Sequence, residues 1–349
     1  MAIITDKKPL VSAIIGTYNY GHYIEEAIDS ILKQAFPQND IEIIVVDDGS
    51  KDDTPERVKK YGDKIKYIYK ENGGQASALN VGFENARGKI LALLDADDYW
   101  HPNKIKYVVD EFERSDRVDV VYHYMNIVDD ENRMVGTQPD SKIENEIYFE
   151  RYPLQNYLKG IMPFCMVTAG ASIRADCLKR IIPIPNDFYL YPDLYMELIL
   201  PFHAEEFALI KKHLGYHRVH GRNTWQGKEK GKEIQIQRTG LEIKLLSLII
   251  RYIDKLAEER GYDSTLLKMK FDSIILEKEI LLYNLQGRKF KALKKAVLFT
   301  DPTLRTSMLY KIFSKISLVA SITIPYSTYI WLRQKYRSSV IFTIVHSLR

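Results

Sequence analysis

The sequence predicts an α/β fold, in which a mostly parallel sheet is flanked by helices, followed by a helical extension. Two observations support this prediction. Apolar, strand-like runs alternate with amphipathic segments over the first hundred residues, a pattern typical of parallel sheets covered by helices. From residue 233 onward, the chain consists of long segments rich in Leu, Ile, Lys and Glu, which favour helices.

The predicted strands of the first hundred residues are short apolar runs without a polar face. They lie at residues 10–15, 41–46, 65–69 and 90–94. Runs of this kind are typical of strands that are buried on both sides.

The predicted helices lie between these strands. Residues 22–34 place their apolar side chains on one face. A second helix follows Thr54, which we interpret as its N-cap because Pro55 comes next. Residues 75–86 form a third helix, for which Gly88 suits the C-cap.

The remainder of the chain is less regular at first. Residues 118–122 and 127–135 indicate strands with a turn at 129–132, and residues 226–232 are polar, as in a linker. Helices are then predicted for residues 233–262 and 265–285.

Composition indicates a soluble protein of the cytoplasm. The chain has 46% hydrophobic and 28% charged residues, which is ordinary for globular proteins. It has only two cysteines, Cys165 and Cys177, too few for a disulfide scaffold. We expect neither a secretory signal nor a membrane-spanning helix, because no apolar run approaches about 20 residues.

Charge is distributed unevenly. Residues 288–349 contain twelve Lys or Arg and one acid, so this segment carries +11 while the whole chain carries +4. Its mixture of basic, apolar and aromatic residues is typical of helices that lie on anionic membrane surfaces. The alternatives are a helical cap on the rest of the chain and a homo-oligomer interface. We do not expect nucleic-acid binding, because no fold known for it is recognisable.

A polar segment follows each predicted strand of the first hundred residues. These segments are residues 16–19, 47–50, 71–75 and 95–98. In an open α/β sheet they would all lie at the carboxyl ends of the strands, where such sheets bind ligands.

Asp95 and Asp97 are the most informative of these residues. They come where a buried strand ends, and burying carboxylates without a partner is costly. A divalent cation is the simplest partner, and a protein-bound cation of this kind commonly holds a phosphate as well.

Four motifs resemble those of family 2 glycosyltransferases, in the same order and spacing. They are residues 11–19, residues 44–50, the Asn72-Gly73-Gly74-Gln75 segment with Asn80-Val81-Gly82, and Asp95-Ala96-Asp97. The resemblance covers about residues 9–225. It implies a GT-A fold, a nucleotide-diphosphate sugar as donor, and Mg²⁺ or Mn²⁺ as cofactor.

The resemblance also implies roles for individual residues. Tyr18 with its neighbours would line the base pocket, and Asp48 would accept a hydrogen bond from the base; alternatively, Asp47 and Asp48 only cap the next turn. The metal would be held by Asp97 with Asp95 and with help from His220, while Arg222 would neutralise the diphosphate. The full set implied for the nucleotide is Gly16, Thr17, Tyr18, Asp48, Gly74, Gln75, Asp95 and Ala96.

A base that deprotonates the acceptor is the last requirement. Residues 190–198 resemble the acidic base motif of the family, and Asp193 is the candidate. Many members have two acids in a row, whereas this chain has Pro192 before Asp193. Asp193 is alternatively a helix N-cap, and Glu197 is the second candidate for the base.

The function implied is an inverting, metal-dependent transfer of a hexosyl or related group from a UDP-sugar. The acceptor would be a saccharide or lipid-linked hydroxyl in cell-surface polysaccharide or glycolipid assembly. Residues 1–225 would be the catalytic domain, with the nucleotide-sugar half at 9–100 and the acceptor half at 101–225. Residues 226–349 would be a basic helical extension, in contact with the inner face of the membrane.

Two other functions stay open. A nucleotidyltransferase that makes nucleotide sugars also uses a parallel sheet and a metal, but it should carry a basic, Gly-rich loop after the first strand. A non-catalytic nucleotide-sugar-binding scaffold would not need the acids that are present. A dehydrogenase is disfavoured, because no Gly-x-Gly-x-x-Gly follows the first strand.

Overall fold

The computed structural model describes residues 8–138, 151–152, 154–158, 168–220, 232–288 and 291. The chain divides into two compact units, Met1–Tyr157 with Met162–Gly227 and Leu158–Ile161 with Lys228–Arg349. The boundary that the sequence predicts at residues 225 and 226 lies outside the described residues and stays a prediction.

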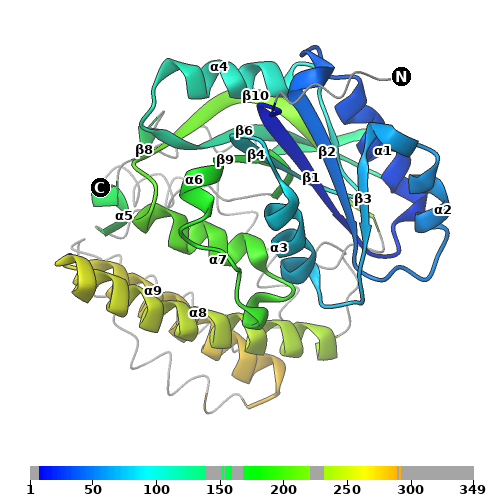
Figure 1. Cartoon of the computed structure of the whole chain (residues 1–349). Coiled ribbons are helices and arrows are strands. Elements are labelled where there is room, and N and C mark those ends of the chain that lie inside the picture. Colours follow the sequence, from blue (N-terminus) through cyan, green and yellow to red (C-terminus); the bar gives the residue numbers. More distant parts are fainter. Residues whose placement is uncertain are drawn as a thin grey trace. The chain divides into compact units, whose positions relative to one another are not determined.

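One ten-stranded sheet forms the centre of the first unit (Figure 1). Its main order is β3-β2-β1-β4-β9-β6-β10-β5, with β7 paired to β6 and β8 paired to β10. The strands are β1 (Val11–Thr17), β2 (Ile41–Asp47), β3 (Lys66–Tyr69), β4 (Ile90–Asp95), β5 (Tyr99–Trp100), β6 (Val118–Val128), β7 (Met134–Gln138), β8 (Arg151–Tyr152), β9 (Ala171–Arg174) and β10 (Glu206–Arg218).

The half of the sheet made by β1 to β4 is parallel, as the sequence predicts. Within it, Gly16 of β1 lies opposite Asp95 of β4, and Thr17 lies opposite Asp47 of β2. This register brings the polar segments after these strands to one edge. In the other half, β9 runs antiparallel to both β4 and β6, while β6 and β10 are parallel.

Helices cover both faces of this sheet. The α-helices are α1 (Gly21–Leu32), α2 (Thr54–Lys59), α3 (Gln75–Asn85), α4 (Lys104–Arg114), α5 (Leu154–Leu158), α6 (Ala175–Leu178) and α7 (Pro192–Ile199). Short 3₁₀ helices lie at Gln38–Asp40, Gly62–Lys64, Thr168–Gly170, Asn186–Phe188 and Leu200–Phe202.

The core has two sides because side chains alternate along each strand. On one side, Ile24 and Ile28 of α1 and Val108 of α4 pack with Val11 and Ala13 of β1. On the other, α3 approaches β1 so closely at Gly82 that a Cβ there would lie 2.5 Å from Cγ2 of Ile14. The two sides hold the carboxyl ends of the strands rigidly, and the candidate site lies at these ends.

The structure corrects two details of the predicted helices. The N-cap of α2 is Asp53, and Thr54 is the first helical residue. Helix α3 ends at Asn85 with Ala86 as its C-cap, so Gly88 is not the cap. Gly88 instead packs on β1, where a Cβ would lie 2.6 Å from the backbone nitrogen of Ser12.

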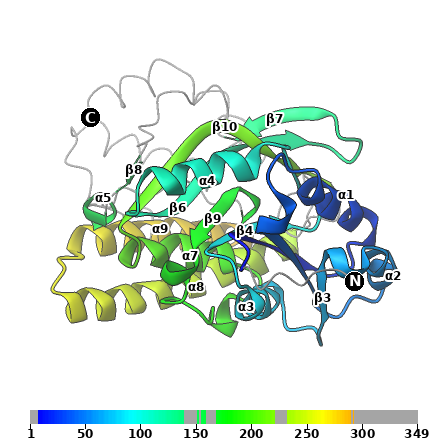
Figure 2. The same ribbon diagram turned by 45° about the horizontal axis from the view of Figure 1, so that its top comes forward.

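The region after residue 101 is more regular than its sequence indicates. Helix α4 was not expected, and residues 118–122 are only the first part of β6, which runs on to Val128. The predicted turn at 129–132 is confirmed, and the β6–β7 hairpin that it closes is visible at the upper right of Figure 2.

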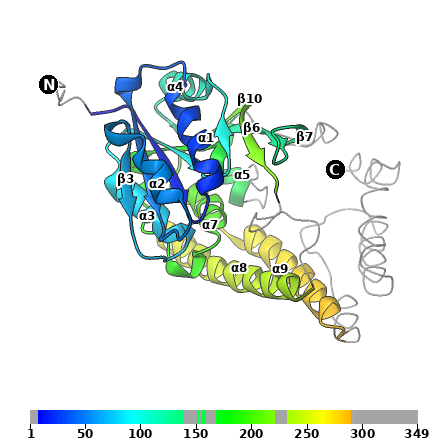
Figure 3. The ribbon, with the colours of Figure 1, turned by 90° about the vertical axis from the view of Figure 1, so that its right-hand side faces the viewer.

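The second unit contains the helices α8 (Lys232–Arg260) and α9 (Thr265–Leu285), which confirms both predicted helices. They lie side by side (Figure 3), joined by ion pairs of Lys278 with Glu242 and of Lys268 with Asp254. None of the described helices combines the length and apolar character needed to cross a membrane. The basic segment 288–349 lies almost entirely outside the described residues.

Candidate functional site

Three carboxylates gather at the end of β4: Asp95, Asp97 and Asp98, which we call the acidic edge. Asp95 accepts a hydrogen bond from the side-chain amide of Gln75 at 3.0 Å. Ala96 between the acids is buried, and Asp98 is fully buried as a side chain. The carboxylates at the end of β4 are therefore poorly hydrated.

Asp98 is held by β10. Its carboxylate accepts the backbone N–H of Arg218 at 2.8 Å and lies 3.1 Å from Nδ1 of His217. Burial alone would lower the pKa of His217, but the charges of Asp98, Asp97 and Asp95 outweigh burial and raise this pKa to about 9. The neighbouring acids thus favour the protonated form of His217, and Asp98 links the end of β4 to β10.

Burial and repulsion both act on Asp95. Burial raises its pKa well above the ordinary value, and the negative charges of Asp98, Asp97 and Asp193 raise it further. Asp193 belongs to α7, about a hundred residues away in the sequence. Binding of a cation would relieve this repulsion.

The loops after β1 and β2 are fastened to each other. Asn19 donates its backbone N–H to Oγ of Ser50 at 2.8 Å and accepts the N–H of Lys51 at 2.7 Å. Asn19 has a φ of 57°, a left-handed conformation that asparagine tolerates well. Between these loops, Tyr18 is 44% exposed, so its ring is available for stacking.

Gly16 and Thr17, which the sequence assigns to the base pocket, are the last two residues of β1. Oγ1 of Thr17 is buried and has no hydrogen-bond partner among the described residues. A buried hydroxyl without a partner is uncommon, and a bound ligand is one way to satisfy it. A Cβ on Gly16 would lie 3.7 Å from Cβ of Ala78, so the backbone lies close to α3.

Asp48 anchors the loop before α3. Its carboxylate accepts hydrogen bonds from the backbone N–H groups of Gly73 at 3.0 Å and Gly74 at 2.7 Å, and from Nζ of Lys70 at 2.6 Å. A carboxylate has about four acceptor positions, so these three bonds leave about one for the base N–H. The contact of Asp48 with the base stays a prediction.

Position 74 can accommodate only glycine without strain. Its φ is 88°, and a Cβ there would lie 2.8 Å from the carbonyl oxygen of Tyr189. That oxygen accepts the backbone N–H of Ala76 at 3.3 Å. The segment before α7 is thereby tied to the start of α3, which carries Gln75.

Asp193 lies in the first turn of α7 and is not its N-cap, which is Tyr191. Its Oδ1 accepts the N–H of Leu194 at 2.9 Å. Burial raises the pKa of Asp193 above its ordinary value, an effect that this hydrogen bond only partly offsets. Glu197 lies one turn further along the same helix and is partly buried.

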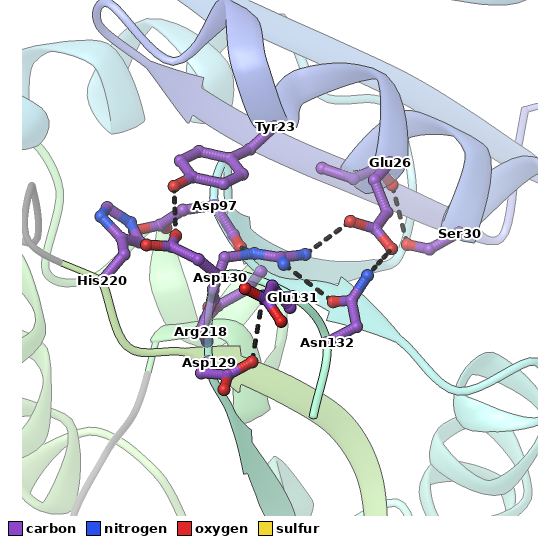
Figure 4. Close-up of polar contacts among 12 residues, drawn as sticks. Tyr23, Glu26, Ser30, Asp97, Asp129, Asp130, Glu131, Asn132, Arg218 and His220 are labelled. Carbon is purple, nitrogen blue, oxygen red and sulfur yellow. Dashed lines mark hydrogen bonds and ion pairs between the residues drawn. The ribbon is translucent and has the colours of Figure 1, made fainter. Parts of the chain in front are cut away.

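His220 completes the site from the end of β10. Its Nε2 lies 3.0 Å from Oδ2 of Asp97, and its ring stacks on Tyr23 with centroids 4.8 Å apart (Figure 4). This contact places an imidazole nitrogen beside a carboxylate oxygen, two groups that could hold a divalent cation.

These residues fit a divalent cation that is shared with a substrate. Among the described residues, no three His, Cys, Asp or Glu side chains form a ready-made metal site. Mg²⁺, however, is usually bound by one or two carboxylates together with substrate phosphates. Asp97 and Asp95 could supply those carboxylates, with His220 next to Asp97, whereas Arg222 lies outside the described residues.

Charge removal at the acidic edge is expected to stabilise the protein without metal. In Asp95→Asn the amide oxygen can still accept from Gln75, but the repulsion with the other acids disappears. We expect the free energy of unfolding to rise by about 0.5–2 kcal/mol. Urea unfolding without divalent ions measures this; Asp110→Asn, at an exposed pair with Lys106, is the control. A loss of stability would contradict the expected repulsion.

Comparisons with known proteins agree with the topology. The family model of Glycosyl transferase family 2 matches residues 12–182. A Nostoc sp. protein, named as an uncharacterized glycosyltransferase, is 30% identical over 72% of this chain and 77% of its own length. A Rickettsia conorii protein of the same description is 38% identical over 58% of this chain, but the match spans only 33% of that protein.

Solved structures show the same fold at low sequence identity. The TarS crystal structure from S. aureus with UDP has a TM-score of 0.50 at 19% identity, covering 89% of this chain and 90% of that one. The mannosyltransferase PcManGT from Pyrobaculum calidifontis, in complex with GDP-Man and Mn²⁺, has a TM-score of 0.56 at 17% identity, covering 94% and 85%.

The sheet topology and these neighbours define a GT-A glycosyltransferase fold, as the sequence predicts. The chain belongs to glycosyltransferase family 2.

Proposed function

We propose that the chain is an inverting, metal-dependent transferase that moves a sugar from a UDP-sugar to an acceptor hydroxyl. The observation that carries this proposal is the link between the start of α7, which holds Asp193, and the acidic edge. Tyr189, just before α7, accepts the backbone N–H of Ala76, and the neighbouring Gln75 donates to Asp95. We therefore infer that a candidate base and candidate metal ligands share one site. Inverting transfer requires both functions at one sugar carbon.

In this proposal, some residues of the first unit bind the cation and another accepts the proton of the acceptor. Asp97, Asp95 and His220 hold the cation, which when bound neutralises the charge that develops on the leaving diphosphate. The oxygen of the acceptor hydroxyl attacks the anomeric carbon from the face opposite the nucleotide. Asp193 takes the proton of that hydroxyl as the attack occurs. A base with a raised pKa is suited to that task because it binds the proton more tightly.

The donor is held by the loops after β1 and β2. Tyr18 offers an exposed ring to the base, and Oγ1 of Thr17 offers a buried hydroxyl without a described partner. We infer UDP as the nucleotide; the structural neighbours were crystallised with UDP, UDP-GlcNAc and GDP-Man. The acceptor is a saccharide or a lipid-linked saccharide of the cell surface.

A thermal-unfolding screen of nucleotide sugars with Mn²⁺ tests the donor. A ligand at about 100 times its Kd stabilises the folded state by about 2.7 kcal/mol. We expect UDP-sugars with Mn²⁺ to raise the melting temperature more than GDP-sugars, and EDTA to reverse the rise. Stabilisation by GDP-sugars alone would identify a GDP-sugar as the donor. If no nucleotide sugar stabilises the protein, the proposal is contradicted.

A further inference from the structure

The side chain of Arg218 is buried next to the acidic edge. Arg218 ends β10 and is only 2% exposed, and a buried guanidinium is costly unless it is hydrogen-bonded. Its Nε donates to the main-chain carbonyl of Asp97 at 2.9 Å, and its backbone N–H donates to Asp98. Arg218 therefore holds the acidic edge with both its side chain and its main chain.

The other two arms of the guanidinium reach separate elements. Nη1 donates to Oδ1 of Asn132 at 2.8 Å, and Nη2 donates to the carboxylate of Glu26 (Figure 4). Asn132 also donates to Glu26 at 3.1 Å. The three side chains close a ring of hydrogen bonds that joins β10, α1 and the β6–β7 turn.

Two aromatic rings lie close to the guanidinium of Arg218. The guanidinium carbon of Arg218 lies 5.0 Å from the ring centre of Tyr23 and 5.4 Å from that of Tyr99. The hydroxyl of Tyr23 donates to Asp130 at 2.6 Å, and its ring stacks on His220. Aromatic faces attract a cation, so these rings help to hold the guanidinium in place.

Arg218 and His220 act on the same residue from two directions. Arg218 binds the carbonyl of Asp97, while Nε2 of His220 lies 3.0 Å from its carboxylate. One contact fixes the main chain and the other fixes the side chain, so together they set the direction of the carboxylate.

We propose that Arg218 is a positioning residue, which presets Asp97 for the divalent cation through the ring with Glu26 and Asn132. This inference rests on the proposed function. Outer partners of metal ligands typically contribute about 10–100-fold to metal affinity. A lysine would keep the charge but not the planar fork that serves three partners.

The Kd of Mn²⁺ tests this proposal, measured by electron paramagnetic resonance in the presence of UDP. In Arg218→Lys we expect it to rise about 10-fold or more. In Glu26→Gln, which removes an outer anchor on a half-exposed side chain, we expect a rise of about 2- to 5-fold. Glu26→Gln decides the question if Arg218→Lys does not fold.

Arg174→Lys is the matched control. Arg174 donates to the carbonyls of Val118, Phe112 and Ser115, but it pairs with Ile90, at the opposite end of β4 from the acidic edge. We expect it to lower the melting temperature and to leave the Kd of Mn²⁺ unchanged, because Arg174 is not an outer partner of the metal ligands.

Wild-type Mn²⁺ affinity in Arg218→Lys and Glu26→Gln would overturn the positioning role and leave the proposed function standing. Equal weakening in Arg174→Lys would also overturn it, because the effect would then reflect general destabilisation. If the wild-type protein itself binds no Mn²⁺ with UDP, the proposed function fails and this inference fails with it.

Discussion

Asp97→Asn is expected to lower sugar transfer by at least about 10³-fold, because the charge that holds the cation against the diphosphate is lost. The amide keeps the shape of the side chain and can still meet His220, so the fold should persist. Steady-state release of UDP from the donor, with saturating Mn²⁺, measures the effect.

The matched control for this variant is Asp110→Asn on the exposed side of α4, where Asp110 pairs with Lys106. It removes the same charge at an exposed position that is not part of the acidic edge and should leave transfer unchanged. Turnover in Asp97→Asn at the rate of Asp110→Asn would contradict the role of Asp97.

Asp193→Asn is expected to lower kcat by about 10²–10⁴-fold, the usual contribution of a general base, with little change in the KM of the donor. Glu197→Gln, one turn along α7, is the matched variant and should retain most of its activity. The opposite pattern, with Glu197→Gln inactive and Asp193→Asn active, would move the base to Glu197.

The pH dependence of kcat/KM is a second measurement for Asp193. Burial raises its pKa, and a base acts only when it is deprotonated. Activity should therefore fall as the pH drops through this raised pKa, with the acid limb above the range of an ordinary aspartate. Asp193→Asn should lack this limb, and a limb retained in that variant would assign it to another group.

Much of the parallel half of the sheet can be predicted from sequence, because its strands are buried on both faces. Runs such as residues 41–46 and 90–94 have no polar face, so strand position follows from composition alone. Four polar segments after such strands then predict where the ligand binds, and their positions at one edge follow from parallel pairing.

The second half of the sheet could not be predicted in the same way. Strand β9 is only four residues long and pairs antiparallel with β4 and β6, so its place depends on contacts distant in sequence. Helix α4 is strongly amphipathic: its buried residues 105, 108, 109 and 112 recur at helical spacing, which is a helix signal in the sequence itself.

Side-chain contacts at the site were also hard to predict where they join residues distant in sequence. The sequence motifs led to Asp95, Asp97 and His220, since their chemistry suits a cation. They gave no sign of Arg218, because its partners Glu26 and Asn132 lie on α1 and on the β6–β7 turn. Nor did they indicate that Asp48 would anchor the loop before α3, as this depends on backbone N–H groups that any residue could supply.

The central claim is that the acidic edge binds a divalent cation together with the diphosphate of a sugar donor. Release of UDP from a UDP-sugar, followed with Mn²⁺ and with EDTA, tests it most directly. We expect release by the wild-type protein to require Mn²⁺, to be lost in Asp97→Asn and to be kept in Asp110→Asn. Release at the same rate in EDTA, or pyrophosphate from a nucleoside triphosphate in place of UDP, would contradict it.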